Sequence, residues 1–116
     1  MKFKLIIASV SDEVTDDIVA AARAEGATGC TVVTSARGQG LKKTKTFFGL
    51  DLSGARDVVL IIVEQHLSRR ILERIAQAGH FDERPGTGVA IMVDVEDAVG
   101  LGTQIHTIQS EIEDEI

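Results

Sequence analysis

Residues 81–93 read FDERPGTGVAIMV, and the glycines before the apolar run are where ligand chemistry is first expected. Glycine lets backbone amides approach a bound group closely, and phosphate is the ligand that such turns most often bind. Gly86, Thr87 and Gly88 therefore predict an anion-binding turn that leads into a strand. The lysine of a Walker loop is absent, because Val89 follows Gly88. The alternative is a plain turn that feeds a strand.

His80 lies just before this turn, and its imidazole could contact a phosphate in a pH-dependent way. The alternative is a polar residue placed after a helix end. We expect His66 and His106 to face solvent rather than to bind a metal. Cys30 is the only cysteine, so the chain can form neither an intrachain disulfide nor a cysteine-based zinc site. We expect the Cys30 side chain to be a buried small hydrophobe, and we predict no metal site and no catalytic residues.

Residues 37–54 contain a basic cluster next to two adjacent phenylalanines and several glycines, which predicts a long loop or a frayed hairpin. Two exposed aromatic side chains on a basic loop are typical of a surface that docks a partner. The alternative is a solvated loop whose phenylalanines pack back onto the body. The residues predicted to contact a partner are Lys42, Lys43, Thr44, Lys45, Phe47 and Phe48.

The composition limits the possible partners. A chain of 116 residues suits one domain, residues 1–116. Its net charge of −6 and its aromatic content of 3% argue against binding duplex or single-stranded nucleic acid. The first residues lack the features of a signal peptide, and no apolar stretch approaches the roughly 20 residues that span a bilayer. We therefore expect a cytoplasmic protein.

Hydrophobic patterning predicts the elements that position these residues. Short apolar runs at 3–10, 30–35, 57–63 and 89–95 predict strands. Helices are predicted after the first and third strands, one capped by Ser11 and closed by Gly26, the other over about 68–78. Residues 105–116 form an acidic tail. The order predicts an α+β, ferredoxin-like βαβ-βαβ sandwich with a four-stranded antiparallel sheet and helices on one face. Aliphatic side chains on the other face favour oligomerisation through it.

Four stretches in this order resemble the PII signal-transduction family, the trimeric nitrogen-regulatory proteins, from residue 3 to near residue 104. Residues 26–32 (GATGCTV) are similar to the family's entry into its second strand. Residues 37–40 (RGQG) resemble the opening of its T-loop. Residues 78–81 (AGHF) with 85–88 (PGTG) resemble its B-loop, and residues 95–99 (VEDAV) resemble its Val-Glu-Glu-Ala-Ile segment.

The resemblance implies a homotrimer with adenine-nucleotide sites in the clefts between subunits. ADP, AMP or ATP would be an effector, and no cofactor would be required. Residues 37–54 would control a partner, such as a membrane transporter. Neither 2-oxoglutarate nor bicarbonate can be assigned as a signal from the sequence. The ligand-binding residues implied are Gly29, Cys30, Thr31, Arg37, Gly38, Gln39, Gly40, Val63, His80, Gly86, Thr87 and Gly88.

The chain also departs from the family's pattern. The B-loop lysines are replaced by His80 and Val89, and the family's Arg-Ile-Arg-Thr-Gly reads GLGTQ at residues 100–104. Each charge-assisted hydrogen bond to phosphate contributes roughly 1.5–3 kcal/mol, so triphosphate binding should be weak. A nucleotide with fewer phosphates or another small anion is predicted. The rival hypotheses are a structural trimer similar to the CutA family, and a small enzyme that uses His80 as acid or base.

Overall fold

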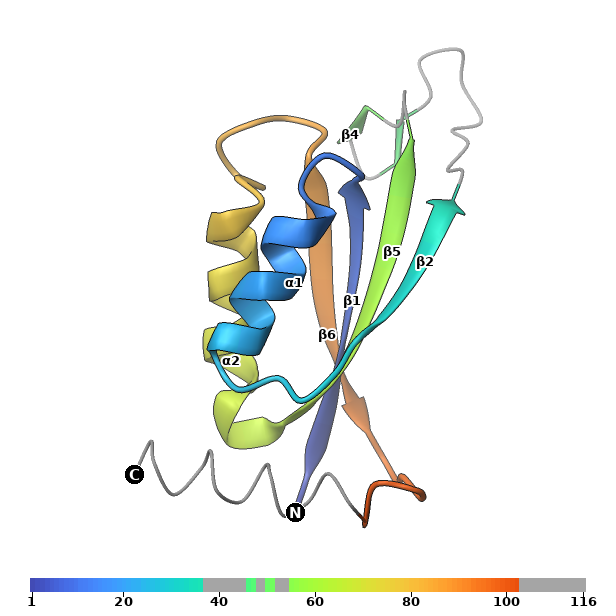
Figure 1. The fold of residues 1–116 in the computed structure, drawn as a ribbon, viewed down its shortest axis with the longest axis vertical. Helices are drawn as coiled ribbons and strands as arrows, with labels where there is room; N and C mark the ends of the chain where they lie inside the picture. Colours follow the sequence, from blue (N-terminus) through green and yellow to red (C-terminus); the bar gives the residue numbers. More distant parts are fainter. Residues whose placement is uncertain (37–45, 48–49, 52–54, 103–116) are drawn as a thin grey trace.

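The computed structural model describes residues 1–36, 46–47, 50–51 and 55–102. Six elements build the body of the domain (Figure 1). A short hairpin pairs two further strands, β3 (Thr46–Phe47) and β4 (Leu50–Asp51). In chain order, the body is made of β1 (Phe3–Ser11), α1 (Thr15–Ala24), β2 (Thr31–Ala36), β5 (Arg56–Glu64), α2 (Gln65–Ala78) and β6 (Gly88–Val95).

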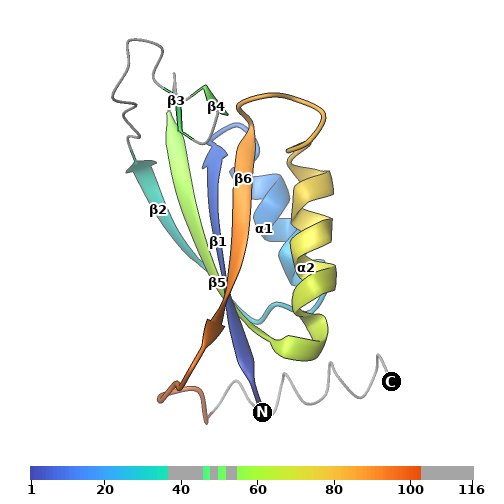
Figure 2. The same ribbon diagram turned by 180° about the vertical axis from the view of Figure 1, so that it is seen from behind.

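The four long strands form one sheet in the order β2-β5-β1-β6, and every neighbouring pair is antiparallel. Helices α1 and α2 lie side by side on one face of this sheet, as both views of the ribbon show (Figures 1 and 2). This arrangement is the predicted ferredoxin-like sandwich, and the prediction of the fold is confirmed.

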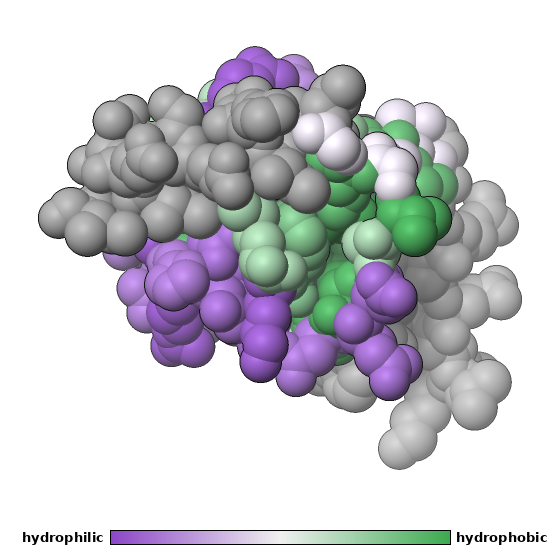
Figure 3. Space-filling view, turned by 90° about the horizontal axis from the view of Figure 1, so that it is seen from below, coloured by the Kyte–Doolittle hydropathy of each residue, from purple (hydrophilic) through white to green (hydrophobic). Residues whose placement is uncertain are grey.

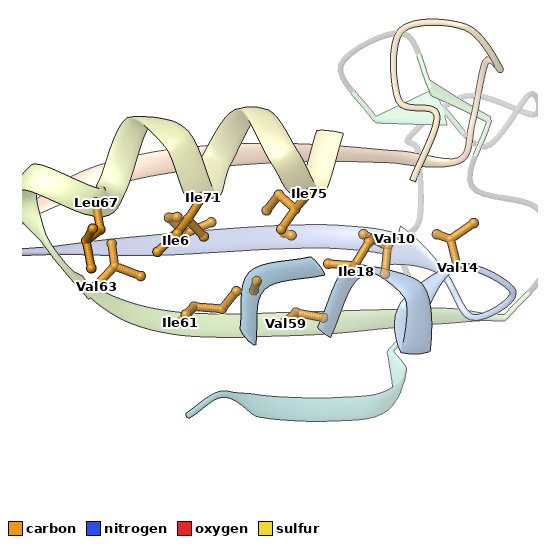
Figure 4. Close-up of a cluster of buried hydrophobic side chains, with 12 residues drawn as sticks. Ile6, Val10, Val14, Ile18, Val59, Ile61, Val63, Leu67, Ile71 and Ile75 are labelled. Atoms are coloured by element: carbon orange, nitrogen blue, oxygen red, sulfur yellow. The ribbon is translucent and has the colours of Figure 1, made fainter. Parts of the chain in front are cut away.

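The core lies between the helices and the sheet (Figure 4). Alternate residues of β1 and β5 point toward the helices, because successive strand side chains face opposite sides of a sheet. Ile6 and Ile61 are fully buried, and they meet Ile18 of α1 and Ile71 and Ile75 of α2. Each fully buried aliphatic side chain contributes about 1.5–3 kcal/mol, so this layer stabilises the position of both helices.

The opposite face of the sheet carries large hydrophobic residues that no described element covers. Ile7 of β1 lies between Leu60 of β5 and Ile91 of β6 in the strand register. Ile91 is 50% exposed, and Val33 of β2 is 47% exposed. Figure 3 shows hydrophobic residues reaching the surface at the lower end of the molecule, beside a hydrophilic side. The predicted exposure of aliphatic side chains on this face is confirmed.

The starts of both helices differ from the prediction. Ser11 does not cap α1: it belongs to β1, pairs with Arg56, and its amide donates to the Thr87 carbonyl (2.7 Å). The cap position of α1 is Val14, without a side-chain hydrogen bond. Helix α2 begins at Gln65 because the Glu64 carboxylate accepts the His66 amide (2.7 Å), a capping role that the sequence pattern did not reveal.

The predicted helix end at Gly26 is confirmed, since its φ of 104° lies in the left-handed region that glycine adopts without strain.

Candidate functional site

The turn between α2 and β6 holds its shape through its own hydrogen bonds. The Arg84 amide donates to the His80 carbonyl (3.0 Å), and the Thr87 amide donates to the Arg84 carbonyl (3.3 Å). The Thr87 hydroxyl lies within hydrogen-bonding distance of the same two carbonyls, at 3.0 Å from His80 and 2.9 Å from Arg84. Thr87, predicted to face an anion, therefore uses both its amide and its hydroxyl inside the turn.

Packing against Phe81 explains why a glycine stands at position 88. A Cβ atom at Gly88 would lie 2.4 Å from Cε1 of Phe81, and one at Gly79 would lie 2.3 Å from the same atom. The Phe81 ring therefore sits against both glycines, and no side chain fits at either position while it stays there. Close approach to this ring explains Gly88 without any ligand.

Gly86 is fixed by a buried arginine. Its φ of 85° lies in the left-handed region, and its carbonyl accepts a hydrogen bond from Arg56 Nη1 (2.5 Å). Arg56 Nη2 donates to the Ser9 carbonyl of β1 (3.2 Å). The Gly86 amide donates to no other residue in the described part of the chain, so it is the group of the Gly86–Gly88 segment best placed to meet a ligand.

His80 has an exposed side and a constrained backbone. Its φ is 54°, unusual for a residue other than glycine, because it closes α2 where a glycine commonly stands. Its Nδ1 lies 3.3 Å from a carboxylate oxygen of Glu83. A neighbouring carboxylate is the wrong charge for a phosphate contact, so any such contact would compete with Glu83.

Gly29, Cys30 and Thr31 lie at the start of β2, on the edge of the sheet opposite to β6. All three residues are exposed. The expectation that Cys30 is buried is wrong: it is exposed, because it enters β2 at the edge of the sheet. A Cβ atom at Gly29 would meet no described atom within 4 Å. One chain thus holds the two predicted halves of the ligand site on opposite edges of its sheet.

Val63 does not fit the implied ligand set. It is 2% exposed, and its side chain packs in the core beside Leu67 (Figure 4). The preceding residue of β5, Ile62, points instead to the face of the sheet that the helices do not cover. Several other predicted residues lie outside the described part of the chain. These are Arg37, Gly38, Gln39, Gly40, Lys42, Lys43, Thr44, Lys45 and Phe48, while Phe47 lies in β3, paired with Leu50.

Sequence reasoning missed Arg56 and Asp57. Both are buried, although both are charged, and Asp57 accepts a hydrogen bond from the Thr15 hydroxyl (2.7 Å). They stand directly before the most apolar strand segment of the chain. Two adjacent residues of opposite charge at the start of a buried strand could have indicated a buried polar network, because buried charges are almost always paired or hydrogen-bonded.

A sequence profile shows the family. The profile of the nitrogen regulatory protein P-II family matches residues 3–104. The chain belongs to the P-II family. This P-II member is also similar in fold to a PII-like signaling protein from Thermus thermophilus, with a TM-score of 0.60 and 23% identity over 82% of this chain and 88% of that one.

A second solved structure is that of CPII from Thiomonas intermedia, bound to ADP, AMP and acetate. It matches this P-II member with a TM-score of 0.64 and 20% identity over 84% of this chain and 89% of that one. At such identities these two structures show the fold alone. No curated protein sequence gives a significant match. None of the helices in the described residues has the length and apolar content needed to cross a membrane.

Proposed function

We propose that this P-II member is a cytoplasmic signalling protein, without enzymatic activity, that senses an adenine nucleotide or a related small anion between the subunits of a homotrimer. Residues 37–54 would transmit the bound state to a partner, such as a membrane transporter. The observation that carries the proposal is the separation of the two predicted half-sites, Gly29–Thr31 and Gly86–Gly88, on opposite edges of one sheet. A second copy of the chain would bring one half-site to the other.

The uncovered face of the sheet supports an oligomer. A patch that contains Ile7, Leu60, Ile62, Ile91 and Val93 is hydrophobic across three adjacent strands. A soluble monomer rarely exposes a contiguous apolar patch of this kind, because its transfer from water is favourable by roughly 25 cal/mol per Å². Burial against further copies removes it from water.

The charges near the turn favour a ligand with few phosphates. The guanidinium of Arg56 is already bonded to two carbonyls, and the His80 imidazole faces Glu83. The Gly86 amide and the exposed guanidinium of Arg84 are the donors that the described turn offers to a ligand. AMP or ADP is therefore the expected class of ligand, and the neighbouring CPII structure, which contains ADP and AMP, supports an adenine nucleotide.

Calorimetric titration of the purified protein with AMP, ADP, ATP and cyclic AMP tests the proposal. The informative variant is Gly29→Leu, because a Cβ atom there meets no described atom of its own chain and the leucine side chain would enter the shared cleft. Ala20→Leu, on the exposed outer side of α1, is the matched control. We expect one nucleotide to bind the wild type and the control, and to bind Gly29→Leu at least about tenfold more weakly.

Light scattering on the same samples measures the assembly. We expect three times the chain mass of 12.4 kDa. A clean monomer would remove the shared cleft and refute the proposal. A trimer that binds none of the four nucleotides would favour the structural-trimer alternative instead.

A further inference from the structure

Arg56 is a buried charge that donates hydrogen bonds to two main-chain carbonyls. It is 2% exposed and lies at the first position of β5. Its two terminal nitrogens donate to main-chain carbonyls of different segments, Gly86 in the turn and Ser9 in β1. A buried guanidinium is strongly disfavoured without such bonds, so the two carbonyls are what allow Arg56 to lie there.

The two bonds join three segments at one end of the sheet. Arg56 itself pairs with Ser11 of β1 and Ala36 of β2 through the strand register. The Ser11 amide in turn donates to the Thr87 carbonyl (2.7 Å). The turn is therefore attached to β1 once through the main chain and once through the Arg56 side chain.

The bond to Gly86 also fixes the direction of its peptide groups. The Gly86 carbonyl and the Thr87 amide belong to one trans peptide group, so when Arg56 holds the carbonyl, the amide points the other way, toward the Arg84 carbonyl (3.3 Å). The left-handed φ of Gly86 then sets where its own amide points. Without the Arg56 bond, Gly86 could adopt several backbone conformations, and its amide would no longer have one fixed direction.

We propose that Arg56 is a positioning residue, which holds the Gly86 carbonyl so that the Gly86 amide is presented to the ligand. The inference rests on the proposed nucleotide function of the same turn. Arg56 acts through the peptide of Gly86 and contacts no ligand itself. A preorganised donor costs less to order on binding, so affinity falls when the holder is removed.

Two substitutions separate geometry from charge. Arg56→Met keeps an apolar stem and removes the charge together with the bonds to the Gly86 and Ser9 carbonyls. Arg56→Lys keeps the charge but cannot donate from two fixed nitrogens at once, because an ammonium is a compact group on a flexible stem. Arg74→Met, on the exposed face of α2, is the control.

Hydrogen exchange and nucleotide titration give two independent readouts. We expect exchange of the Ser11 and Thr87 amides to rise about tenfold or more in both Arg56 variants, since a bond to a charged donor is lost. The Ile18 amide, which donates to the Val14 carbonyl within α1, should not change. The nucleotide dissociation constant should rise about tenfold in both variants and stay unchanged in Arg74→Met.

Unchanged exchange at Ser11 and Thr87 would overturn the inference. Faster exchange in the Arg56 variants with an unchanged nucleotide dissociation constant would also overturn it. Arg56 would then hold the turn, but this would not help the nucleotide to bind. A wild-type affinity in Arg56→Lys would overturn it too, because charge alone would then matter. If the wild type binds no nucleotide, the proposed function fails, and the exchange data alone decide whether Arg56 fixes the turn. Should Arg56→Met not fold, Arg56→Lys gives the answer.

Discussion

Substitution of Gly88 by alanine tests whether this glycine exists for packing or for a ligand. The added Cβ atom would lie 2.4 Å from Cε1 and 2.8 Å from both Cδ1 and Cζ of Phe81. Such distances are far inside van der Waals contact, so the ring must leave its position beside Gly79 and Gly88. The φ of Gly88 is not in the left-handed region, so the backbone itself accepts alanine and the cost is steric.

Overpacking of this kind costs typically about 1–3 kcal/mol, which corresponds to a fall in Tm of roughly 4–12 °C for a domain of this size. Urea unfolding followed by circular dichroism measures the free energy directly. Gly29→Ala is the control, since a Cβ atom there meets no described atom, and it should leave the stability within about 0.5 kcal/mol of the wild type.

A double-mutant cycle makes the test specific. In a Phe81→Leu background the obstructing ring is gone, so Gly88→Ala should cost close to nothing, and the coupling energy should nearly equal the cost of the single substitution. If Gly88→Ala is as stable as the wild type, or if Phe81→Leu does not relieve its cost, the packing explanation of Gly88 is refuted. A loss of nucleotide affinity at full stability would then restore the ligand explanation.

Three further predictions follow from single residues. His80→Gly should raise the free energy of unfolding by up to about 1 kcal/mol, measured by urea titration, because glycine adopts the φ of 54° without strain. The hydrogen bond and the charge of Lys4 hold the pKa of the Asp94 carboxyl below its ordinary value of 3.8. The ion pair should therefore stabilise the fold above that value and be lost as the pH falls through the lowered pKa, and an NMR titration should show the pKa return toward 3.8 in Lys4→Met. Gly102→Arg, at a position where a Cβ atom meets no described atom, should increase the calorimetric affinity for ADP about tenfold by adding a cation where the family resemblance places one.

The fold could be predicted because its signals are periodic. The stripe that contains Ile18, Ala21 and Ala22 indicates which face of the first helix is buried, and the apolar run before Glu64 indicates a strand. Two such strand–helix units in sequence leave few possible topologies. Helix starts were predicted less well. Ser11 has the side chain of a cap, but its pairing with Arg56 extends β1 through it, and tertiary pairing overrides a local preference.

The candidate site could be predicted only in outline. Sequence reasoning chose residues 86–88, and the structure shows a compact turn there. It could not show that Thr87 and Gly88 already have partners inside the chain, since Phe81 and His80 contact them only after the turn folds back. The role of Arg56 was equally hidden, because its bond spans 30 residues. Contacts of this kind depend on three-dimensional register, which no local pattern encodes.

The charge of the turn implies an order of affinities. Each additional phosphate brings about one negative charge at neutral pH, and a site gains from it only where a donor or cation is available. In the described part of the turn, the Gly86 amide is open, the guanidinium of Arg56 is committed, and Glu83 stands beside His80. The exposed guanidinium of Arg84 in the same turn could meet a second phosphate, whereas a third phosphate would add desolvation and repulsion without a further partner there. The wild type should therefore bind AMP and ADP more tightly than ATP. Gly102→Arg should narrow or reverse that order, and a preference for ATP in the wild type would show that further cations, from the neighbouring subunit or from outside the described residues, complete the site.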